Sequence, residues 1–241
     1  MKSLVIVTSA VESRFGIYKP QERLDMTLAT IANLRERIPD VSIAISEVSG
    51  AGLKAEYEDQ LMEACDVYLD FTTNAEVNEI YTNPAWYDNW DIVKNLTELT
   101  TFPLALKAIR DSGDIWGNER LFKMSGRYLL NDKFDIEWYN ARPQRFKIVI
   151  GKRYPSQFPF EVTQLREQYM ARLLSWPIAM HENMIQYYEN ACNYMRQRLL
   201  AGGYADIEHC LFYALPKEHV LEVEEVGVYG NIAPNGHPIV N

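Results

Sequence analysis

The first third of the chain alternates short apolar runs with amphipathic stretches, and this order restricts the fold more than any other feature. Residues 4–7, 41–45 and 67–71 are mostly apolar runs with the length of strands that are covered on both faces. Between them, apolar residues recur at helical spacing over 24–38 and 53–64. Because strands and helices alternate, we expect a parallel sheet with right-handed crossovers, that is, an α/β, Rossmann-like fold.

The remainder of the chain is less regular. Residues 75–90 mix aromatic side chains with Asn, Asp and Pro, which favours a loop with aromatic anchors. A helix is expected over 92–109 with a break or kink at Pro103, and strands are expected at 121–130 and 146–150. The last third is expected to hold helices at 165–173, 184–199 and 207–215, then a tail with short strand signals and a Pro-Asn-Gly turn at 234–236. We therefore predict a mostly parallel sheet with flanking helices and a helical C-terminal third, in one domain over residues 1–241.

The net charge and the cysteines narrow the class of protein. The formal net charge is −9, which argues against a nucleic-acid partner or an anionic membrane surface. Cys65, Cys192 and Cys210 form no CxxC pair, so neither a zinc site nor a disulfide framework is expected. The N-terminus does not resemble a signal peptide, and no apolar run approaches the roughly 20 residues of a membrane span. The simplest expectation is a reduced, cytoplasmic protein without a transmembrane segment.

Two cations lie in the segment 121–132, which is expected to be a buried strand that ends in polar residues. Lys123 and Arg127 are four residues apart, so both side chains would share one face of an extended chain. A core strand rarely keeps two cations on one face without an anion nearby. That anion is either a carboxylate of the protein or a phosphate of a ligand.

Polar residues follow each expected strand. In an open α/β sheet, ligands bind outside the carboxyl ends of the strands. The residues at these ends are Thr8 and Ser9, Glu47, Thr72 and Thr73, and Asn131 and Asp132. Strand ends also attract such residues as caps and turn formers, so one position alone is weak evidence. Their joint placement favours a binding site.

Familiar catalytic motifs are missing from the chain. It has no GxGxxG after the first strand, no GxxxxGK[ST], no HExxH and no GxSxG, which weakens the dehydrogenase, P-loop, zinc-protease and α/β-hydrolase alternatives. Asp132 and Asp135 are three residues apart after a strand and form a weak candidate for a magnesium or manganese site.

Two further positions carry candidate chemistry. Glu208 precedes His209 beside an apolar run, so it is either a general base or a helix-start glutamate stabilised by the helix dipole. Lys94 and Glu98 are one helical turn apart. They would either form a weak surface pair or face a pocket together.

Several stretches resemble a known family. Residues 122–128, Phe-Lys-Met-Ser-Gly-Arg-Tyr, followed by Asn131 and Asp132, are similar to an FK-x-SGRY-x-L stretch of bacterial and phage glycosyltransferases of surface-polysaccharide type, which have a GT-A-like fold. The Ile-Pro-Asp that ends the first expected helix, the Arg-Leu-Leu-Ser-Trp at 172–176 and the closing stretch 226–236 also resemble that family. The resemblance covers most of the chain through short motifs.

The resemblance implies a nucleotide-sugar donor, bound by the half over residues 1–74, and a glycan acceptor at the half over 75–241. Thr8 and Glu47 would then lie near the base and ribose. The cations Lys94, Lys123 and Arg127 would neutralise the diphosphate, which gains negative charge as it leaves. Glu208 would deprotonate the acceptor hydroxyl.

One departure from the family concerns the metal. GT-A enzymes commonly carry an Asp-x-Asp motif for Mg²⁺ or Mn²⁺, and this chain has none. Either Asp132 replaces it, or cations take over the role of the metal, or catalysis has been lost. The expected function is transfer of a sugar from a nucleotide donor to a glycan or similar acceptor hydroxyl in polysaccharide biosynthesis. The alternatives are a non-catalytic nucleotide- or partner-binding protein on the same scaffold, and another nucleotide-dependent transferase.

Overall fold

A seven-stranded sheet forms the centre of the computed structural model, which describes residues 2–50, 52–141, 144–231 and 238–240. Its strands are β1 (Ser3–Ser9), β2 (Ser42–Glu47), β3 (Val67–Asp70), β4 (Arg120–Ser125), β6 (Ile148–Pro155), β7 (Glu167–Pro177) and β8 (Val220–Val223). They lie in the order β3-β2-β1-β4-β7-β6-β8, and only β7 runs antiparallel to its neighbours. The predicted mostly parallel α/β sheet is confirmed.

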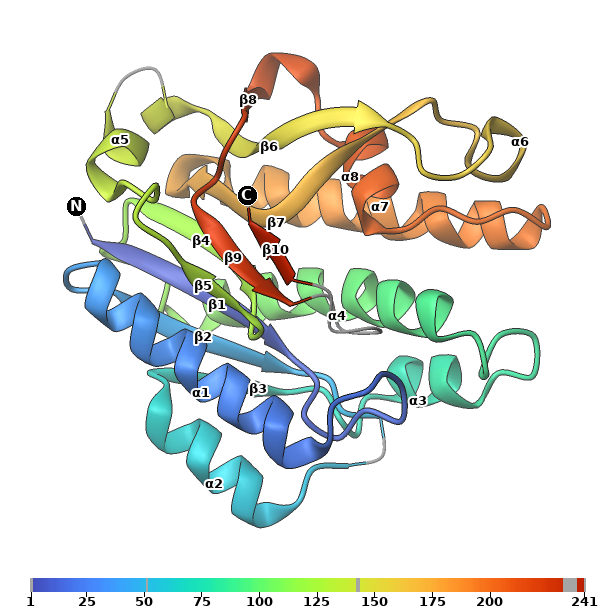
Figure 1. Ribbon diagram of the computed structural model, residues 1–241, viewed down its shortest axis with the longest axis horizontal. Helices are drawn as coiled ribbons and strands as arrows, with labels where there is room; N and C mark the ends of the chain where they lie inside the picture. Colours follow the sequence, from blue (N-terminus) through green and yellow to red (C-terminus); the bar gives the residue numbers. More distant parts are fainter. Residues whose placement is uncertain (1, 51, 142–143, 232–237, 241) are drawn as a thin grey trace.

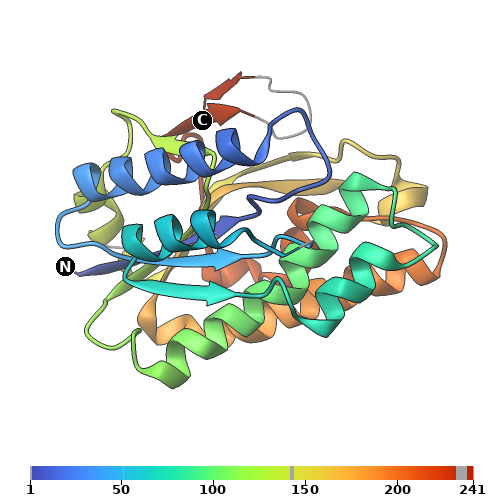
Figure 2. The ribbon, with the colours of Figure 1, turned by 90° about the horizontal axis from the view of Figure 1, so that it is seen from below.

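The helices of the first half form where the spacing of apolar residues predicted them. Helix α1 (Pro20–Arg37) begins with a proline and a capping box in which the Glu22 side chain accepts from the Lys19 backbone N–H at 2.7 Å. It ends just before Asp40, which has a φ of +53°. Helix α2 (Ala55–Ala64) follows β2. Both pack on one face of the sheet, beside which a small second sheet forms from β5 (Tyr128–Leu130), β9 (Val228–Asn231) and β10 (Pro238–Val240) (Figures 1 and 2).

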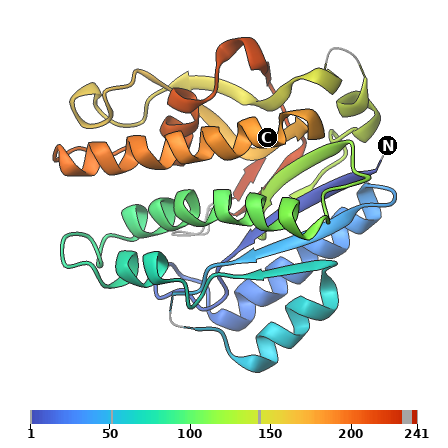
Figure 3. The same ribbon diagram turned by 180° about the vertical axis from the view of Figure 1, so that it is seen from behind.

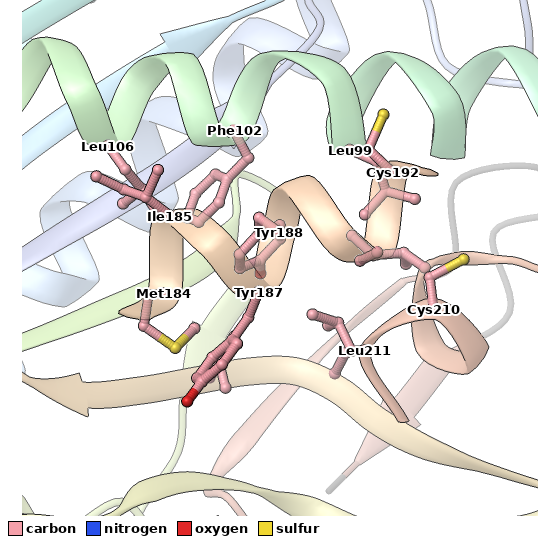
Figure 4. Packing of buried hydrophobic residues seen from close by; sticks show 14 of the residues in the cluster. Leu99, Phe102, Leu106, Met184, Ile185, Tyr187, Tyr188, Cys192, Cys210 and Leu211 are labelled. Atoms are coloured by element: carbon pink, nitrogen blue, oxygen red, sulfur yellow. The ribbon is translucent and has the colours of Figure 1, made fainter. Parts of the chain in front are cut away.

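The opposite face of the sheet is covered by α3 (Ala75–Thr82), α4 (Trp90–Ser112), α7 (His181–Leu200) and α8 (Ile207–Ala214) (Figure 3). Figure 4 shows Phe102 of α4 against Tyr188 of α7, with ring centroids 4.4 Å apart. The remaining helical segments are short: α5 (Ile136–Asn140), α6 (Phe160–Thr163), and 3-10 turns at Gln144–Phe146, Ile178–Met180 and Lys217–His219. Within the described ranges, none of the helices has both the length and the apolar character needed to cross a membrane.

The segment 121–132 is not one strand, as the sequence suggested. Strand β4 ends at Ser125, the chain turns at Gly126, and β5 then pairs with β9 in the small sheet. A Cβ on Gly126 would lie 2.7 Å from the Thr27 hydroxyl, so this turn needs a residue without a side chain. The chain then runs back along α1, where Thr30 donates to the Tyr128 carbonyl at 3.0 Å.

The expected helix at 165–173 was wrong. These residues belong to β7, which spans 11 residues between β4 and β6. A central strand is buried on both faces, so its apolar residues show no alternation, and a spacing of four then imitates a helix. The longer helices described in the C-terminal third are therefore α7 and α8, both close to their predicted positions.

Two expectations about the middle of the chain also need correction. Helix α4 continues through Pro103, so the break that the sequence allowed there is absent. Its flanking turns are buried against α7 and the sheet, and this packing outweighs the missing backbone donor. Residues 75–82 form helix α3 in place of the expected loop, because Asn74 caps it by accepting from the backbone N–H groups of Glu76 and Val77. The predicted turn at 234–236 lies outside the described residues.

Candidate active site

A cleft opens at the carboxyl ends of the parallel strands. Its walls come from the ends of β1, β2 and β4, from the first half of α4, from the middle of β7 and from the first turn of α8. The space between these walls is about 1070 Å³, including solvent at the mouth. This is the edge at which ligands bind in open α/β sheets.

The cleft is cationic although the protein as a whole is acidic. Among the described residues, its walls carry five cations, Arg23, Lys94, Lys123, Arg127 and Arg172, and two carboxylates, Glu98 and Glu208. The whole chain has a formal net charge of −9. A local excess of positive charge in such a chain favours an anionic ligand.

Lys123 is neutralised by the protein itself. It forms an ion pair with Glu98 of α4, and both side chains are largely buried. Burial alone would raise the pKa of Glu98, but Lys123 and Lys94 outweigh it and hold that pKa below its ordinary value. For Lys123, the anion that the sequence required is therefore a protein carboxylate, and the pair forms a fixed floor of the cleft.

Arg127 keeps its charge available. It lies on the β4–β5 turn and lines the cleft, and within the described parts of the chain it forms no ion pair. Its Nε is buried without a hydrogen-bond partner there. Asp66, which directly precedes the edge strand β3, is paired with Arg35 at 3.3 Å. A buried guanidinium donor without an acceptor is costly, and a ligand anion would remove that cost.

Lys94 is one helical turn from Glu98 and is exposed in the cleft. The protein atoms packed around Lys94 would by themselves lower its pKa through desolvation, although part of the side chain is exposed to the cleft, but the carboxylates of Glu208 and Glu98 outweigh this effect and raise that pKa. The ammonium group is therefore charged at neutral pH. The three cations predicted from the sequence, Lys94, Lys123 and Arg127, all line the same cleft.

Glu208 lies in the first turn of α8, opposite Lys94. Its environment raises its pKa to about 7, first through burial and then through repulsion by Asp206, although Lys94 and Lys123 partly oppose this. Asp206 caps α8 by accepting from the His209 backbone N–H at 3.0 Å. A carboxylate with a pKa near neutrality, on the wall of a cleft, suits a general base.

Of the polar residues at the strand ends, Thr8 lines the cleft as predicted, whereas Glu47 does not. Glu47 is fully buried, and its Oε1 accepts from the backbone N–H groups of Val11 at 3.2 Å and Ser49 at 2.9 Å. Burial raises the pKa of this carboxyl. Glu47 therefore supports the loops after β1 and β2 behind the cleft wall, and it is not positioned to touch a base or ribose.

Asp132 also lies outside the cleft. Its side chain is 93% exposed and pairs with Arg37 at 2.8 Å. Arg37 ends α1, and a crossover helix ends at the amino edge of a parallel sheet, which is the edge opposite the cleft. The chain reaches that edge because it leaves the main sheet at Gly126. Asp135 caps α5, so the two aspartates form no metal site.

Among the cleft residues that the sequence did not suggest as site residues are Arg23, Arg172 and Trp90. Arg23 lies in the first turn of α1, where a cation opposes the helix dipole. The unfavourable position of this cation could therefore have marked Arg23 as a candidate site residue in the sequence. Its guanidinium donates to the Phe15 carbonyl at 2.6 Å, so it also fixes the loop after β1. Arg172 was hidden by the incorrect helix at 165–173.

The donor set of the cleft does not fit a divalent cation. No group of three or more His, Cys, Asp or Glu side chains suitable for a metal occurs among the described residues. The two carboxylates of the cleft face lysines, and the other charges on its walls are positive. Mg²⁺ and Mn²⁺ require oxygen ligands that are free to coordinate.

No protein-family model matches the chain, and no curated protein matches its sequence. Solved structures do share its fold. Core-mannan synthase A (CmsA/Ktr4) of Aspergillus fumigatus, in its Mn/GDP form, superposes with a TM-score of 0.54 over 95% of this chain and 74% of its own, at 7% identity. The galactosyltransferase LgtC, in complex with donor and acceptor sugar analogues, gives 0.52 over 92% and 73%, at 10% identity. The fold is therefore the Rossmann-like GT-A fold of glycosyltransferases, as predicted.

Proposed function

We propose that this protein is a glycosyltransferase that moves a sugar from a nucleotide-sugar donor to a hydroxyl of a glycan or similar acceptor, such as a surface polysaccharide. The observation that carries the proposal is the cleft at the carboxyl edge of a GT-A sheet, where uncompensated cations face a carboxylate with a near-neutral pKa. Fold alone would not support it, since one fold serves many functions.

The cations suit the leaving group of this reaction. When the acceptor oxygen bonds to the anomeric carbon, the bond from that carbon to the phosphate oxygen breaks, and the nucleoside diphosphate leaves with the electron pair. In this proposal Arg127 and Lys94, which both line the cleft, stabilise this developing charge. The evidence for a contact with the diphosphate is stronger for Arg127 than for Lys94, because the buried Nε of Arg127 has no hydrogen-bond partner among the described residues.

Glu208 suits the other end of the reaction. In this proposal its carboxylate takes the proton that the acceptor hydroxyl releases as it attacks. Glu208 comes from α8 and Arg127 from the β4–β5 turn, so in this proposal the anionic leaving group lies with Arg127 and the acceptor with Glu208. The nucleoside would occupy the wall near Thr8 and Ser46, at the ends of β1 and β2.

The proposal is tested by incubating the protein with a panel of nucleotide sugars and measuring release of nucleoside diphosphate. We expect one donor to be hydrolysed slowly and to be consumed faster when acceptor saccharides are added. Binding without any turnover would favour a non-catalytic binding protein. Cleavage of nucleoside triphosphates in place of sugar-linked diphosphates would favour a nucleotidyltransferase.

A further inference from the structure

Trp90 is a large aromatic side chain on the cleft wall that the proposed transfer does not use. It is the first residue of α4, it lines the cleft, and 41% of its surface is exposed. A lone exposed aromatic needs no explanation, but one that lines a polar cleft is a candidate for ligand contact.

The backbone beneath Trp90 is held in place before any ligand arrives. The side chain of Asn89 caps α4 by accepting from the backbone N–H groups of Asp91 at 3.2 Å and Ile92 at 3.3 Å. Asn95 donates to the Asp91 carboxylate at 2.9 Å and to the Tyr204 hydroxyl at 2.8 Å, which ties this end of α4 to the segment before α8. An aromatic side chain on a fixed helix end loses little conformational entropy when it binds a ligand.

Trp90 is also placed next to the proposed base. It precedes Lys94 by four residues, so the two side chains lie on the same face of α4, about one helical turn or roughly 5–6 Å apart along the axis. Lys94 interacts electrostatically with Glu208. A ligand stacked on the Trp90 indole would therefore have Lys94 between it and Glu208.

Two aspartates lie behind this end of the cleft wall. Asp91 is adjacent in sequence, and Asp206 is close enough to raise the pKa values of both Asp91 and Glu208. Neither aspartate lines the cleft, whereas Glu208 does, and its carboxylate can accept a hydrogen bond from a ligand hydroxyl. Lys123 belongs to β4 and Arg127 to the turn that follows it, whereas Trp90 begins α4.

We infer that Trp90 is the platform on which a pyranose ring of the acceptor stacks, with its C–H face on the indole and a hydroxyl directed at Glu208. A pyranose combines an apolar C–H face with polar edges, and the negative face of an aromatic ring attracts C–H groups. This inference rests on the proposed function and adds the chemical class of the acceptor site.

The test uses saturation-transfer NMR with methyl glycosides of glucose, galactose, mannose and N-acetylglucosamine, on the protein alone and in the presence of nucleoside diphosphate. Variants are Trp90→Ala, Trp90→Phe and, as a matched control, Trp116→Ala. Trp116 is 70% exposed and lies beyond the other end of α4, roughly 30 Å away. Nucleoside diphosphate affinity is measured separately by calorimetry for each variant.

We expect at least one glycoside to bind the wild type through its C–H protons. Trp90→Ala should weaken that binding about fivefold to tenfold, Trp90→Phe should weaken it less, and Trp116→Ala should leave it unchanged. Nucleoside diphosphate affinity should stay the same in all of them. Loss of nucleotide affinity in Trp90→Ala would place the base on the indole and overturn the inference, as would the absence of any glycoside signal on the wild type. Failure of nucleotides to bind the wild type, with glycosides still binding through Trp90, would instead refute the proposed function.

Discussion

At the scale of single residues, Glu208 is the group on which the proposed chemistry depends. The sequence pointed to it through its neighbour His209, but the structure separates the two. The His209 ring is fully buried and lies between Asp206, whose Oδ1 is 2.6 Å from its Nδ1, and Ser156, whose hydroxyl is 2.8 Å from its Nε2. A ring without exposed surface cannot exchange protons with a substrate. It holds Asp206 in place behind Glu208.

Replacement of Glu208 should separate catalysis from binding. Glu208→Gln should reduce sugar transfer by about 10²–10⁴-fold, the usual contribution of a positioned base, and leave nucleoside diphosphate affinity nearly unchanged. The control is Asp132→Asn, which alters the exposed aspartate at the opposite edge of the sheet and should leave the transfer rate as it is. The rates are compared at saturating donor. Full activity in Glu208→Gln would remove this residue from the mechanism.

The pH dependence of transfer should report the same carboxyl. Glu208 acts as a base only when ionised, and its pKa is raised to about 7, so the rate should rise with pH through about 7. Asp206 is one cause of that elevation, so Asp206→Asn should lower the pKa of Glu208 and shift the rise to lower pH. Asparagine is also a good helix cap, so α8 should stay folded. Identical pH profiles in the two proteins would contradict this.

At the scale of elements, the sequence predicted best where local spacing decides the structure. The strands and helices of residues 4–71 are present as predicted, because the spacing of apolar residues within each segment is enough to identify it. Strand β7 was mistaken for a helix because the elements that bury it, β4 and β6 at its sides and α8 on one face, lie elsewhere in the sequence. The path after Ser125 was missed for a similar reason, since β5 pairs with β9, about 100 residues further along. The prediction that Asp132 lies at the carboxyl edge of the sheet was wrong for the same reason.

The β4–β5 turn offers a test of how the structure positions Arg127. Gly126→Ala would place a methyl group 2.7 Å from the Thr27 hydroxyl, so α1 and the turn must move apart. We expect a loss of about 1–3 kcal/mol in the free energy of unfolding, measured by urea denaturation, with weaker binding of nucleoside diphosphate. The double variant Gly126→Ala with Thr27→Ala removes the clash and should recover part of both. No recovery would show that the contact is unimportant.

At the scale of the whole molecule, charge is distributed unevenly, and composition alone concealed this. A net charge of −9 excludes a broad basic surface, yet the folded chain collects cations from α1, α4, β4, β7 and the β4–β5 turn in one cleft. Two of them, Lys123 and Arg127, were visible in the sequence as an unexplained pair. The structure distinguishes them, because Glu98 neutralises Lys123, whereas Arg127 forms no ion pair with any of the residues that the structure describes.

This uneven distribution of charge predicts that the binding of nucleoside diphosphate does not depend on a divalent cation. The cleft's two carboxylates face lysines, so they are poorly placed as metal ligands, while Arg127 and Lys94 supply positive charge directly. Nucleoside diphosphate affinity and the transfer rate should therefore be equal in EDTA and in excess Mg²⁺ or Mn²⁺. A loss of affinity of tenfold or more in EDTA would mean that a metal is required.

The most direct test of the account is calorimetric titration of the protein in EDTA with a panel of nucleoside diphosphates. We predict that at least one binds, and that Arg127→Gln weakens it at least about tenfold, since a hydrogen bond to a charged group contributes about 1.5–3 kcal/mol. The control Arg145→Gln, at an exposed ion pair with Glu119, should bind as the wild type does. If no nucleoside diphosphate binds, or if Arg127→Gln binds as tightly as the wild type, the cationic cleft is not a diphosphate site.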